Sequence, residues 1–447
     1  MTTVLKMRNI VTLVIIFCVV LILVYLEFRD ESSRAIPHQA NNQEYTKGVW
    51  EEHEPQDQGR DTLVRISPIA DSDMSEKLSE EDHDERGMDA HPSPKIQTPL
   101  LRHIPSGVIS MAPDIFETVP RQFLPNYKSP CWFNKQNKLY CLPYFYIIGM
   151  AKCGTTDLWD KITRHPHVLA SVPKEPHWWS RRRRGIDTRN IPIHQKEARQ
   201  ISKMIGEKED SSIDWYLNWY KTFGVKSIES SPSQNADGDV TFPKVFGDAS
   251  ISTSFDIGKT WEEGNYTNAD LIHAVQPQAK IIMIVRNPTQ RFSSQFHYNG
   301  FRDTSPAALD HKAKEEISCF TSCLQEHSER YCTFRRSCRM LNAIYIAIAK
   351  DWMRVYGRDG VYILTLEDWY GNTGKEFEKL LKFLELPALP KDEISRITRR
   401  KPKNVNARSA RGSMWNTTRD LLQDFFRPFN KRFASFMNDT RFLYDEG

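Results

Sequence analysis

The sequence contains no internal repeat, no CxxC pair, no neighbouring HxxxH pair and only one long run of apolar residues. Because structural zinc sites usually draw on such closely spaced pairs, zinc binding by its cysteines is disfavoured. The length of 447 residues allows one large domain or two ordinary ones. An apolar content of 39% is sufficient for a hydrophobic core.

The one long apolar run, residues 10–26, has 17 residues and no charge. This length lies at the lower limit for a helix that spans a bilayer. A cleaved signal peptide is the alternative, but no small-x-small cleavage site follows, and Glu27 opens a charged stretch. Lys6 and Arg8 precede the run, so the positive-inside rule places residues 1–9 in the cytoplasm. We therefore expect an uncleaved membrane anchor, with everything after it in the lumen.

Charge is distributed unevenly along the chain, although its net value is only +4. Residues 27–100 carry 18 acidic and 8 basic side chains, so with two cations in the N-terminal tail a net charge of +12 falls on residues 101–447. A basic body favours anionic partners such as nucleotides, acidic polymers or nucleic acid. Residues 27–126 are rich in Glu, Asp, Ser, Pro and Gln without a sustained apolar period, which predicts a largely disordered lumenal stem. The compact body is expected over residues 127–447.

Six of the eight cysteines are available for disulfides, since Cys18 lies in the apolar run and Cys153 in a glycine-containing loop. Three disulfides would fit an oxidising lumen. Cys131 and Cys141 are the natural local pair. The other four, which allow three connectivities, are Cys319, Cys323, Cys332 and Cys338. Three Asn-x-Thr triplets also agree with a secretory route.

Short β-branched or aromatic runs alternate with segments of helical period along the body. The strand candidates are residues 144–148, 167–171, 244–248, 280–286 and 360–366, and the helix candidates are residues 157–164, 211–222, 288–298, 341–356 and 374–384. This alternation predicts an α/β fold with a mostly parallel sheet flanked by helices. In such folds, ligands bind at the carboxyl ends of the strands.

The first strand candidate runs directly into the sequence GMAKCGTT, residues 149–156, and a helix follows. A strand, a glycine-containing turn and a helix N-terminus direct several N–H groups toward one place, which suits a phosphate. Gly154 allows close approach of the backbone, Thr155 and Thr156 add hydroxyl groups, and Lys152 adds a cation. A nucleoside-triphosphate P-loop would place lysine directly after this glycine, so a kinase or triphosphatase is disfavoured. An ordinary strand–turn–helix corner is the purely structural alternative.

A second anion site is suggested by RNPTQRFSS, residues 286–294, which follows the apolar strand candidate KIIMIVR. Arg286 at the strand end and Ser294 two helical turns later can bind a phosphate through charge-assisted hydrogen bonds. Alone this pattern is weak, because Arg286 could instead pair with a carboxylate. Together with the first loop it indicates a nucleotide that is phosphorylated at both ends.

A third pattern, KEPHWW, follows the second strand candidate and combines a carboxylate with an imidazole. Glu175 is a candidate general base for an alcohol, and His177 is the reserve base. A surface ion pair beside core tryptophans is the structural alternative. Residues 181–184 are four consecutive arginines, which could form a solvated surface or hold a sulfated or carboxylated chain.

Residues 127–447 resemble the Golgi carbohydrate sulfotransferases. The resemblance rests on KCGTTDLWD and the pair Arg286 and Ser294, and on LPYFYIIG, KEPHWW, GDAS and RPFN. It implies a P-loop-like sulfotransferase domain that takes a sulfuryl group from 3′-phosphoadenosine 5′-phosphosulfate. The enzymes of this family that the sequence most resembles act on the 6-hydroxyl of N-acetylgalactosamine 4-sulfate in chondroitin and dermatan sulfate. The expected location is the Golgi membrane, in single-pass type II orientation, with a glycosaminoglycan rather than a nucleic acid as partner.

The resemblance also implies roles for single residues. Lys152 would contact the 5′-phosphosulfate and stabilise the leaving group, and Glu175 would accept the proton of the acceptor hydroxyl. The residues expected to bind the donor are Lys152, Cys153, Gly154, Thr155, Thr156, Arg286, Ser294 and Arg408. No metal is expected, because a sulfuryl group carries less charge than a phosphoryl group, so lysine and N–H donors can stabilise its transfer.

Two alternatives stay open within this interpretation. Heparan-type relatives have a lysine in the segment that aligns with residues 248–251, Asp-Ala-Ser-Ile, and this lysine is missing here. A heparan-type O-sulfotransferase is therefore the first alternative. The second is a non-catalytic lumenal protein that binds acidic glycans through its basic surface.

Overall fold

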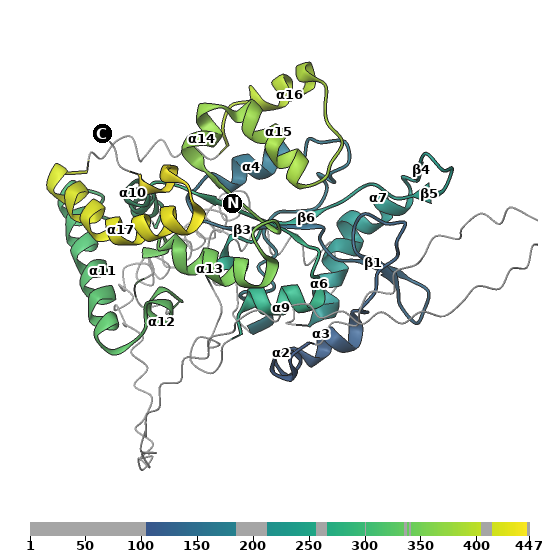
Figure 1. Ribbon diagram of the computed structural model, residues 1–447, viewed down its shortest axis with the longest axis horizontal. Helices are drawn as coiled ribbons and strands as arrows, with labels where there is room; N and C mark the ends of the chain where they lie inside the picture. The colour runs from purple at the N-terminus through teal and green to yellow at the C-terminus, as the bar shows by residue number, and fades with distance from the viewer. Residues whose placement is uncertain are drawn as a thin grey trace, which may run out of the picture. The chain divides into compact units, whose positions relative to one another are not determined.

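The computed structural model describes residues 104–184, 212–255, 266–299, 301–334, 338, 341–403 and 414–444. These residues contain a sheet of four parallel strands in the order β6-β3-β7-β8. The strands are β3 (Phe145–Gly149), β6 (Gly247–Asp248), β7 (Lys280–Val285) and β8 (Val361–Thr365). Nearly every residue of β3 and β7 is buried, as expected for a parallel sheet with helices on both faces (Figure 1).

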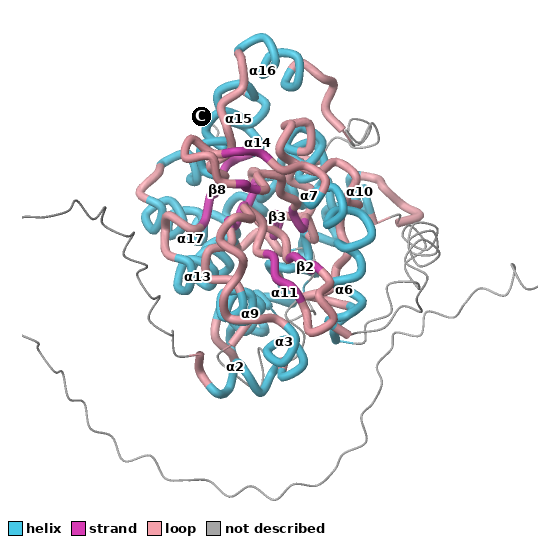
Figure 2. The backbone as a smooth tube through the Cα atoms, turned by 90° about the vertical axis from the view of Figure 1, so that its right-hand side faces the viewer, coloured by secondary structure: helices cyan, strands magenta, loops and turns pink. Residues whose placement is uncertain are grey.

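Helices lie on both sides of this sheet. In both views α15 and α16 lie above the strands, and α9 and α13 lie below them (Figures 1 and 2). The helices are α2 (Ser106–Met111), α3 (Pro113–Thr118), α4 (Thr155–Ile162), α6 (Ile213–Tyr220), α7 (Lys226–Glu229), α9 (Asn268–Val275), α10 (Pro288–Tyr298), α11 (Pro306–Glu326), α12 (Glu329–Phe334), α13 (Tyr345–Tyr356), α14 (Leu366–Gly371), α15 (Thr373–Phe383), α16 (Lys391–Thr398) and α17 (Asn416–Met437). The mostly parallel α/β fold predicted from the alternation of segments is therefore confirmed.

Shorter elements complete the described part of the chain. The antiparallel pairs are β1 (Cys131–Phe133) with β2 (Leu139–Cys141), and β4 (Ser233–Gln234) with β5 (Val240–Thr241). The 3-10 turns are η1 (Arg182–Arg184), η4 (Ile251–Ser254) and η6 (Thr440–Leu443), and η3 (Lys221–Val225) is a π-helical turn. Of these, η4 matters most for the site, because it packs against β3.

Three of the five predicted strands are confirmed, as β3, β7 and β8. The candidate at residues 244–248 contributes only β6, Gly247–Asp248, to the sheet. The candidate at residues 167–171 is wrong, because only Val168 forms a bridge, to Val245. Prolines at positions 166 and 173 bracket this stretch, and a proline has no N–H with which to extend a ladder.

All five predicted helices are present, with ends shifted by a few residues. Residues 106–118, which their composition places in the stem, also form two short helices. Val108 in α2 and Ile115 in α3 are buried, and these helices pack against α9 and α6. The packed body therefore begins upstream of residue 127, because a few apolar side chains at helical spacing suffice to dock a short segment.

Six of the seven described cysteines form three disulfides, and Cys153 is free. The predicted Cys131–Cys141 pair is confirmed and joins β1 to β2. The remaining pairs are Cys319–Cys338 and Cys323–Cys332, one of the three connectivities left open by the sequence. Within the described ranges no group of His, Cys, Asp and Glu side chains could hold a metal ion. No helix in those ranges is long and apolar enough to cross a bilayer, and the predicted anchor at residues 10–26 lies outside them.

Candidate active site

The predicted phosphate loop connects the end of β3 to the start of α4. The N–H of Met150 donates to the carbonyl of Ile284 in β7 at 2.8 Å, which fixes the loop to the neighbouring strand. Gly154 precedes α4 with a φ of 84°, in the left-handed region that favours glycine. A Cβ atom at this position would lie 2.5 Å from Cδ1 of Leu366. Both the left-handed φ and the packing of Leu366 therefore favour glycine at this turn before α4.

Lys152 lies within this loop and contacts the ring of Tyr298 at the end of α10. Its Nζ is 3.8 Å from the ring centroid, a cation–π distance. Burial lowers the pKa of Lys152 to about 8, and the positive charges of Arg291 and Arg286 act in the same direction. The ammonium is thus charged at neutral pH and loses its proton under mildly alkaline conditions.

Arg291 in α10 holds the phosphate loop in place, a role that the sequence interpretation missed. Its guanidinium is fully buried, and Nε donates to the carbonyl of Ala151 at 3.0 Å. The position of Arg291 within RNPTQRFSS was the available signal. This hydrogen bond fixes the loop backbone at Ala151.

The side chain of Cys153 points into the core. Its thiol is fully buried, lies 3.8 Å from the hydroxyl of Tyr345, and has a pKa that burial raises to about 11. Its N–H donates to the carbonyl of Met150 at 3.2 Å. Thr155 and Thr156 lie in the first turn of α4, where helix N–H groups have no partner within the helix.

Arg286 directly follows β7, two residues before α10 begins, and Ser294 lies within α10. The carbonyl of Arg286 accepts the hydroxyl of Tyr345 at 2.8 Å, and its guanidinium donates to Oε1 of Gln290 at 3.2 Å. The guanidinium thus binds an amide, whereas the structural alternative predicted an ion pair with a carboxylate. Ser294 is 8% exposed. The hydroxyl of Tyr345 also lies 3.8 Å from the thiol of Cys153, so one side chain contacts both predicted phosphate motifs.

Helix α14, directly after β8, contacts both phosphate motifs. Leu366 fills the space beside Gly154 in the first loop. Glu367 accepts the N–H of Asn287 at 2.9 Å, immediately after Arg286. Neither residue was singled out from the sequence, because their partners lie far away in the chain. One short helix therefore sets the spacing of the two sites.

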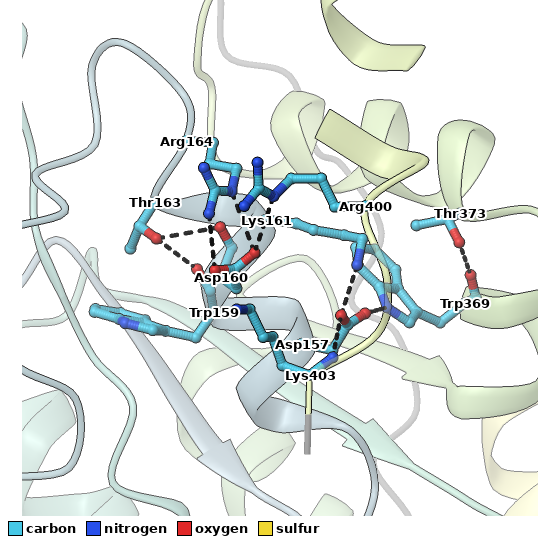
Figure 3. A network of polar contacts seen from close by, with 10 residues as sticks. All are labelled: Asp157, Trp159, Asp160, Lys161, Thr163, Arg164, Trp369, Thr373, Arg400 and Lys403. Carbon is cyan, nitrogen blue, oxygen red and sulfur yellow. Dashed lines mark hydrogen bonds and ion pairs between the residues drawn. The ribbon is translucent and has the colours of Figure 1, made fainter. Parts of the chain in front are cut away.

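Asp157 in α4 joins three segments around the loop (Figure 3). Its carboxylate is fully buried and accepts from Lys161 Nζ at 2.6 Å, from Trp369 Nε1 at 2.8 Å and from the N–H of Lys403 at 3.0 Å. The described chain stops at Lys403 in this region. The predicted donor contact Arg408 lies outside the described residues.

Glu175 and His177 form the centre of the third predicted pattern. The carboxylate of Glu175 pairs with Lys174 and lies 3.2 Å from Nε2 of His177. Nδ1 of His177 lies 2.7 Å from the hydroxyl of Ser252. Glu175 and His177 have φ values of 66° and 52°, a left-handed conformation that side chains other than glycine seldom adopt. Such strain is common where a side chain is held for function.

The turn η4 connects this pattern with the phosphate loop. Ser252, which contacts His177, lies in η4, and Ser254 of the same turn donates to the sulfur of Met150 at 3.3 Å. Gly149 faces Ser254 so closely that a Cβ would lie 2.7 Å from its hydroxyl oxygen. The structure thus brings Glu175 and His177 to the same end of the sheet as Lys152.

Buried polar contacts fix the segment around Glu175 to the end of β6. Trp179 donates to the hydroxyl of Tyr216 at 2.9 Å, and that hydroxyl donates to Asp248 at 2.8 Å. Burial lowers the pKa of Lys174 to about 7, with the negative charge of Asp248 acting in the opposite direction.

The arginines after KEPHWW bind the protein itself. Arg182 is buried and donates to the carbonyl of Pro176 at 2.7 Å. Arg183 forms two hydrogen bonds with Asp114, at 2.7 and 2.9 Å, and holds the pKa of that carboxyl below its usual value. Arg184 donates to Asn268 at 3.0 Å. These contacts weaken the hypothesis that the arginine run holds an acidic glycan.

Comparison with known proteins agrees with this geometry. Residues 143–390 match the sulfotransferase family, and the chain belongs to that family. It is a sulfotransferase that depends on 3′-phosphoadenosine 5′-phosphosulfate. The alternatives of a triphosphate kinase and of a non-catalytic glycan-binding protein are therefore set aside.

Among named relatives, the chain is similar to carbohydrate sulfotransferase 15 of Homo sapiens, with 29% identity over 391 residues that cover 74% of this chain and 67% of the relative. It is also 24% identical over 285 residues to the human bifunctional heparan sulfate N-deacetylase/N-sulfotransferase 2, covering 62% of this chain and 26% of that protein. A solved sulfotransferase from Alicyclobacillus acidocaldarius aligns with 67% of this chain and 97% of its own, with 20% identity and a TM-score of 0.41.

Proposed function

We propose that the protein transfers a sulfuryl group to the 6-hydroxyl of N-acetylgalactosamine, already 4-sulfated, in chondroitin or dermatan sulfate. The position of α14 supports the donor half of this proposal most strongly. Leu366 packs on Gly154, and Glu367 binds the N–H of Asn287 at 2.9 Å. One helix thus holds together two cationic sites, as a donor with phosphates at its 3′ and 5′ ends requires.

The loop and α4 form the proposed site for the 5′-phosphate, through Lys152, Gly154, Thr155 and Thr156. The thiol of Cys153 is buried and its N–H donates to the carbonyl of Met150, so Cys153 is proposed as a donor contact on the resemblance alone. Arg286 and Ser294 form the proposed site for the 3′-phosphate. The first N–H groups of α4 have no partner within the helix, so they can donate to a phosphate oxygen. Arg408 is proposed to close over the nucleotide on the resemblance alone.

The proposed reaction is an in-line substitution at sulfur. The donor supplies an activated sulfuryl group: a bond from the acceptor oxygen to sulfur forms while the bond from sulfur to the 5′-phosphate oxygen breaks. Glu175 accepts the proton of the acceptor hydroxyl. Lys152 stabilises the negative charge that develops on the departing phosphate oxygen. No other proton acceptor is required for the balance.

We propose that His177 orients Glu175 and that Glu175 is the base. Nε2 of His177 lies 3.2 Å from Glu175, and Nδ1 lies 2.7 Å from Ser252. If the proton resides on Nε2, the imidazole donates to the carboxylate and accepts from the serine. Since both ring nitrogens have protein partners, an acceptor hydroxyl would have to displace one of them to reach the ring.

The acceptor class is proposed from the relatives and from the segment after β6. The relatives bear names of carbohydrate and heparan sulfate sulfotransferases. The lysine of heparan-type enzymes is missing from residues 248–251, and Asp248 there is buried and accepts from the N–H of Ser250 at 2.8 Å. Because this lysine is missing, a chondroitin-type acceptor is preferred over a heparan-type one.

We also propose a Golgi location, with a cytoplasmic tail at residues 1–9, a type II anchor at residues 10–26, then a lumenal stem and, after it, the catalytic domain. The uncharged run of 17 residues with cations before it supports the anchor. The three disulfides are compatible with an oxidising lumen.

Transfer of labelled sulfate tests the proposed activity. The full chain would be incubated with labelled donor and a panel of chondroitin, chondroitin 4-sulfate, dermatan sulfate and heparan sulfate, followed by disaccharide analysis. We expect the 4,6-disulfated N-acetylgalactosamine unit as the product from chondroitin 4-sulfate and dermatan sulfate. Sulfation of heparan sulfate alone would overturn the proposed acceptor and leave the donor site standing.

A further inference from the structure

Tyr298 is an exposed aromatic residue that faces the loop lysine. It is the last residue of α10, and 44% of it is exposed to solvent. Its ring centroid lies 3.8 Å from Nζ of Lys152, well inside the range of about 6 Å for cation–π attraction. A tyrosine ring in this position interacts with the charged form of lysine and hardly at all with the neutral form.

The other groups around Lys152 mostly oppose its charge. Burial has the largest effect, followed by the positive charges of Arg291 in α10 and Arg286 at the end of β7. Cys153, the next residue in the loop, would favour the charge only as a thiolate, and burial raises its pKa to about 11. Before an anion binds, the face of Tyr298 is therefore an important contact that favours the ammonium.

We propose that Tyr298 is a positioning residue for Lys152: its ring keeps the ammonium charged and in place until the donor binds. This inference rests on the proposed role of Lys152 as the cation that meets the 5′-phosphate. Tyr298 touches neither reacting atom in the proposed reaction and acts through the lysine. Its effect is therefore expected in the pH dependence of donor binding.

The test compares Tyr298→Leu, which removes the π face, with Tyr298→Phe, which keeps it. Binding of adenosine 3′,5′-bisphosphate to the full chain would be measured by calorimetry between pH 7 and 9.5, where the phosphates remain dianionic. For the wild type and for Tyr298→Phe, we expect affinity to fall as pH rises through about 8, where Lys152 loses its proton. In Tyr298→Leu this midpoint should lie about half a pH unit lower.

Two controls identify the source of the shift. Lys152→Met should abolish this pH dependence, because no titrating ammonium remains. Phe133→Leu removes another exposed aromatic side chain, from β1, and should leave the midpoint unchanged. Circular dichroism of each variant would check that the fold is retained.

The outcomes separate this inference from the donor site itself. Equal midpoints in Tyr298→Leu and Tyr298→Phe would overturn the role of Tyr298 while leaving the donor site intact. So would a higher KM for the glycan acceptor in Tyr298→Leu without a shifted midpoint, since the ring would then serve the sugar. No binding of the bisphosphate to the wild type at any pH would overturn the donor site, and with it this inference.

Discussion

Leu366 lies against Gly154, with Cδ1 of the leucine 2.5 Å from the position that a Cβ atom on the glycine would take. The leucine begins α14 and the glycine precedes α4, so the contact joins two segments that are far apart in the chain. The glycine is required for two reasons: its φ of 84° and the leucine above it. A change at Gly154 therefore affects both the stability of the fold and the shape of the phosphate loop.

We expect Gly154→Ala to lower the free energy of unfolding by about 2–4 kcal/mol, from left-handed strain and overpacking together. Binding of the bisphosphate should be lost even where the variant remains folded, because the Cβ displaces the loop or Leu366. Denaturant unfolding and calorimetric titration measure the two effects.

Gly238→Ala is the matched control, since Gly238 has nearly the same φ, 85°, with no atom within 4 Å of its Cβ position. It should lower the free energy of unfolding by only about 1–2 kcal/mol and leave donor binding unchanged. Equal effects of the two substitutions on binding would contradict the importance of the leucine contact.

The buried hydrogen bonds of Asp157 lead to a second prediction about the stability of the fold. Asp157→Ala leaves Lys161 buried without its carboxylate, and Trp369 and the N–H of Lys403 without their acceptor (Figure 3). We expect a loss of about 3–5 kcal/mol in the free energy of unfolding, measured by denaturant titration. Asp157→Ala combined with Lys161→Met should lose less, because no unpaired charge is buried.

Asp160→Ala is the control for Asp157, as this neighbour pairs with Arg164 at 3.0 Å in a partly exposed ion pair. Its substitution should cost less than about 1 kcal/mol. A similar cost for Asp157→Ala would mean that the buried network adds little to the stability of the domain.

Glu175→Gln should lower kcat by about 10²–10⁴-fold, because the amide cannot accept the proton of the acceptor hydroxyl. Affinity for the bisphosphate should change little, since Glu175 contacts Lys174 and His177 rather than the phosphate loop. Glu378→Gln, on the exposed side of α15, should match the wild type in both assays. Full sulfate transfer by Glu175→Gln would remove this carboxylate from its proposed role.

Arg286→Ala should raise the KM for the donor by about 10–100-fold with a small effect on kcat, as expected for the loss of one charge-assisted contact. The exposed Arg419→Ala in α17 is the matched control for the loss of a positive charge. An unchanged donor KM in Arg286→Ala would place the 3′-phosphate elsewhere.

The pH profile follows from Lys152. Its pKa is lowered to about 8, and the charged form is the one that binds phosphate, so kcat/KM for the donor should decline as pH rises through about 8. Steady-state kinetics over pH 6–9.5 measure this decline. A profile that stays flat up to pH 9.5 would contradict a role for the Lys152 charge in donor capture.

Local patterns in the sequence predicted the central strands of the sheet well. Apolar runs such as β3 and β7 are buried on both faces, so their composition alone identifies them. The loop motif singled out Gly154, and the structure places this residue in the left-handed region with a φ of 84°. The strand predicted at residues 167–171 was wrong, because flanking prolines restrict a stretch whose composition otherwise favours a strand.

Contacts between distant segments could not be predicted in this way. The pairing of Asp157 with Trp369 spans 212 positions, and neither residue signals its partner. The long helices α11 and α17 were not predicted: α11 buries few side chains for its 21 residues, and α17 continues through Pro428, which usually ends a helix. Tertiary packing, rather than the local sequence pattern, stabilises these two helices.

The most direct measurement is calorimetric binding of adenosine 3′,5′-bisphosphate to the full chain in the presence of EDTA, for the wild type and for Lys152→Ala combined with Arg286→Ala. We predict binding without magnesium by the wild type and a loss of at least about 100-fold in affinity in the double variant. Equal affinity in the two proteins, or binding that requires magnesium, would contradict a donor site built from the loop lysine and the arginine after β7.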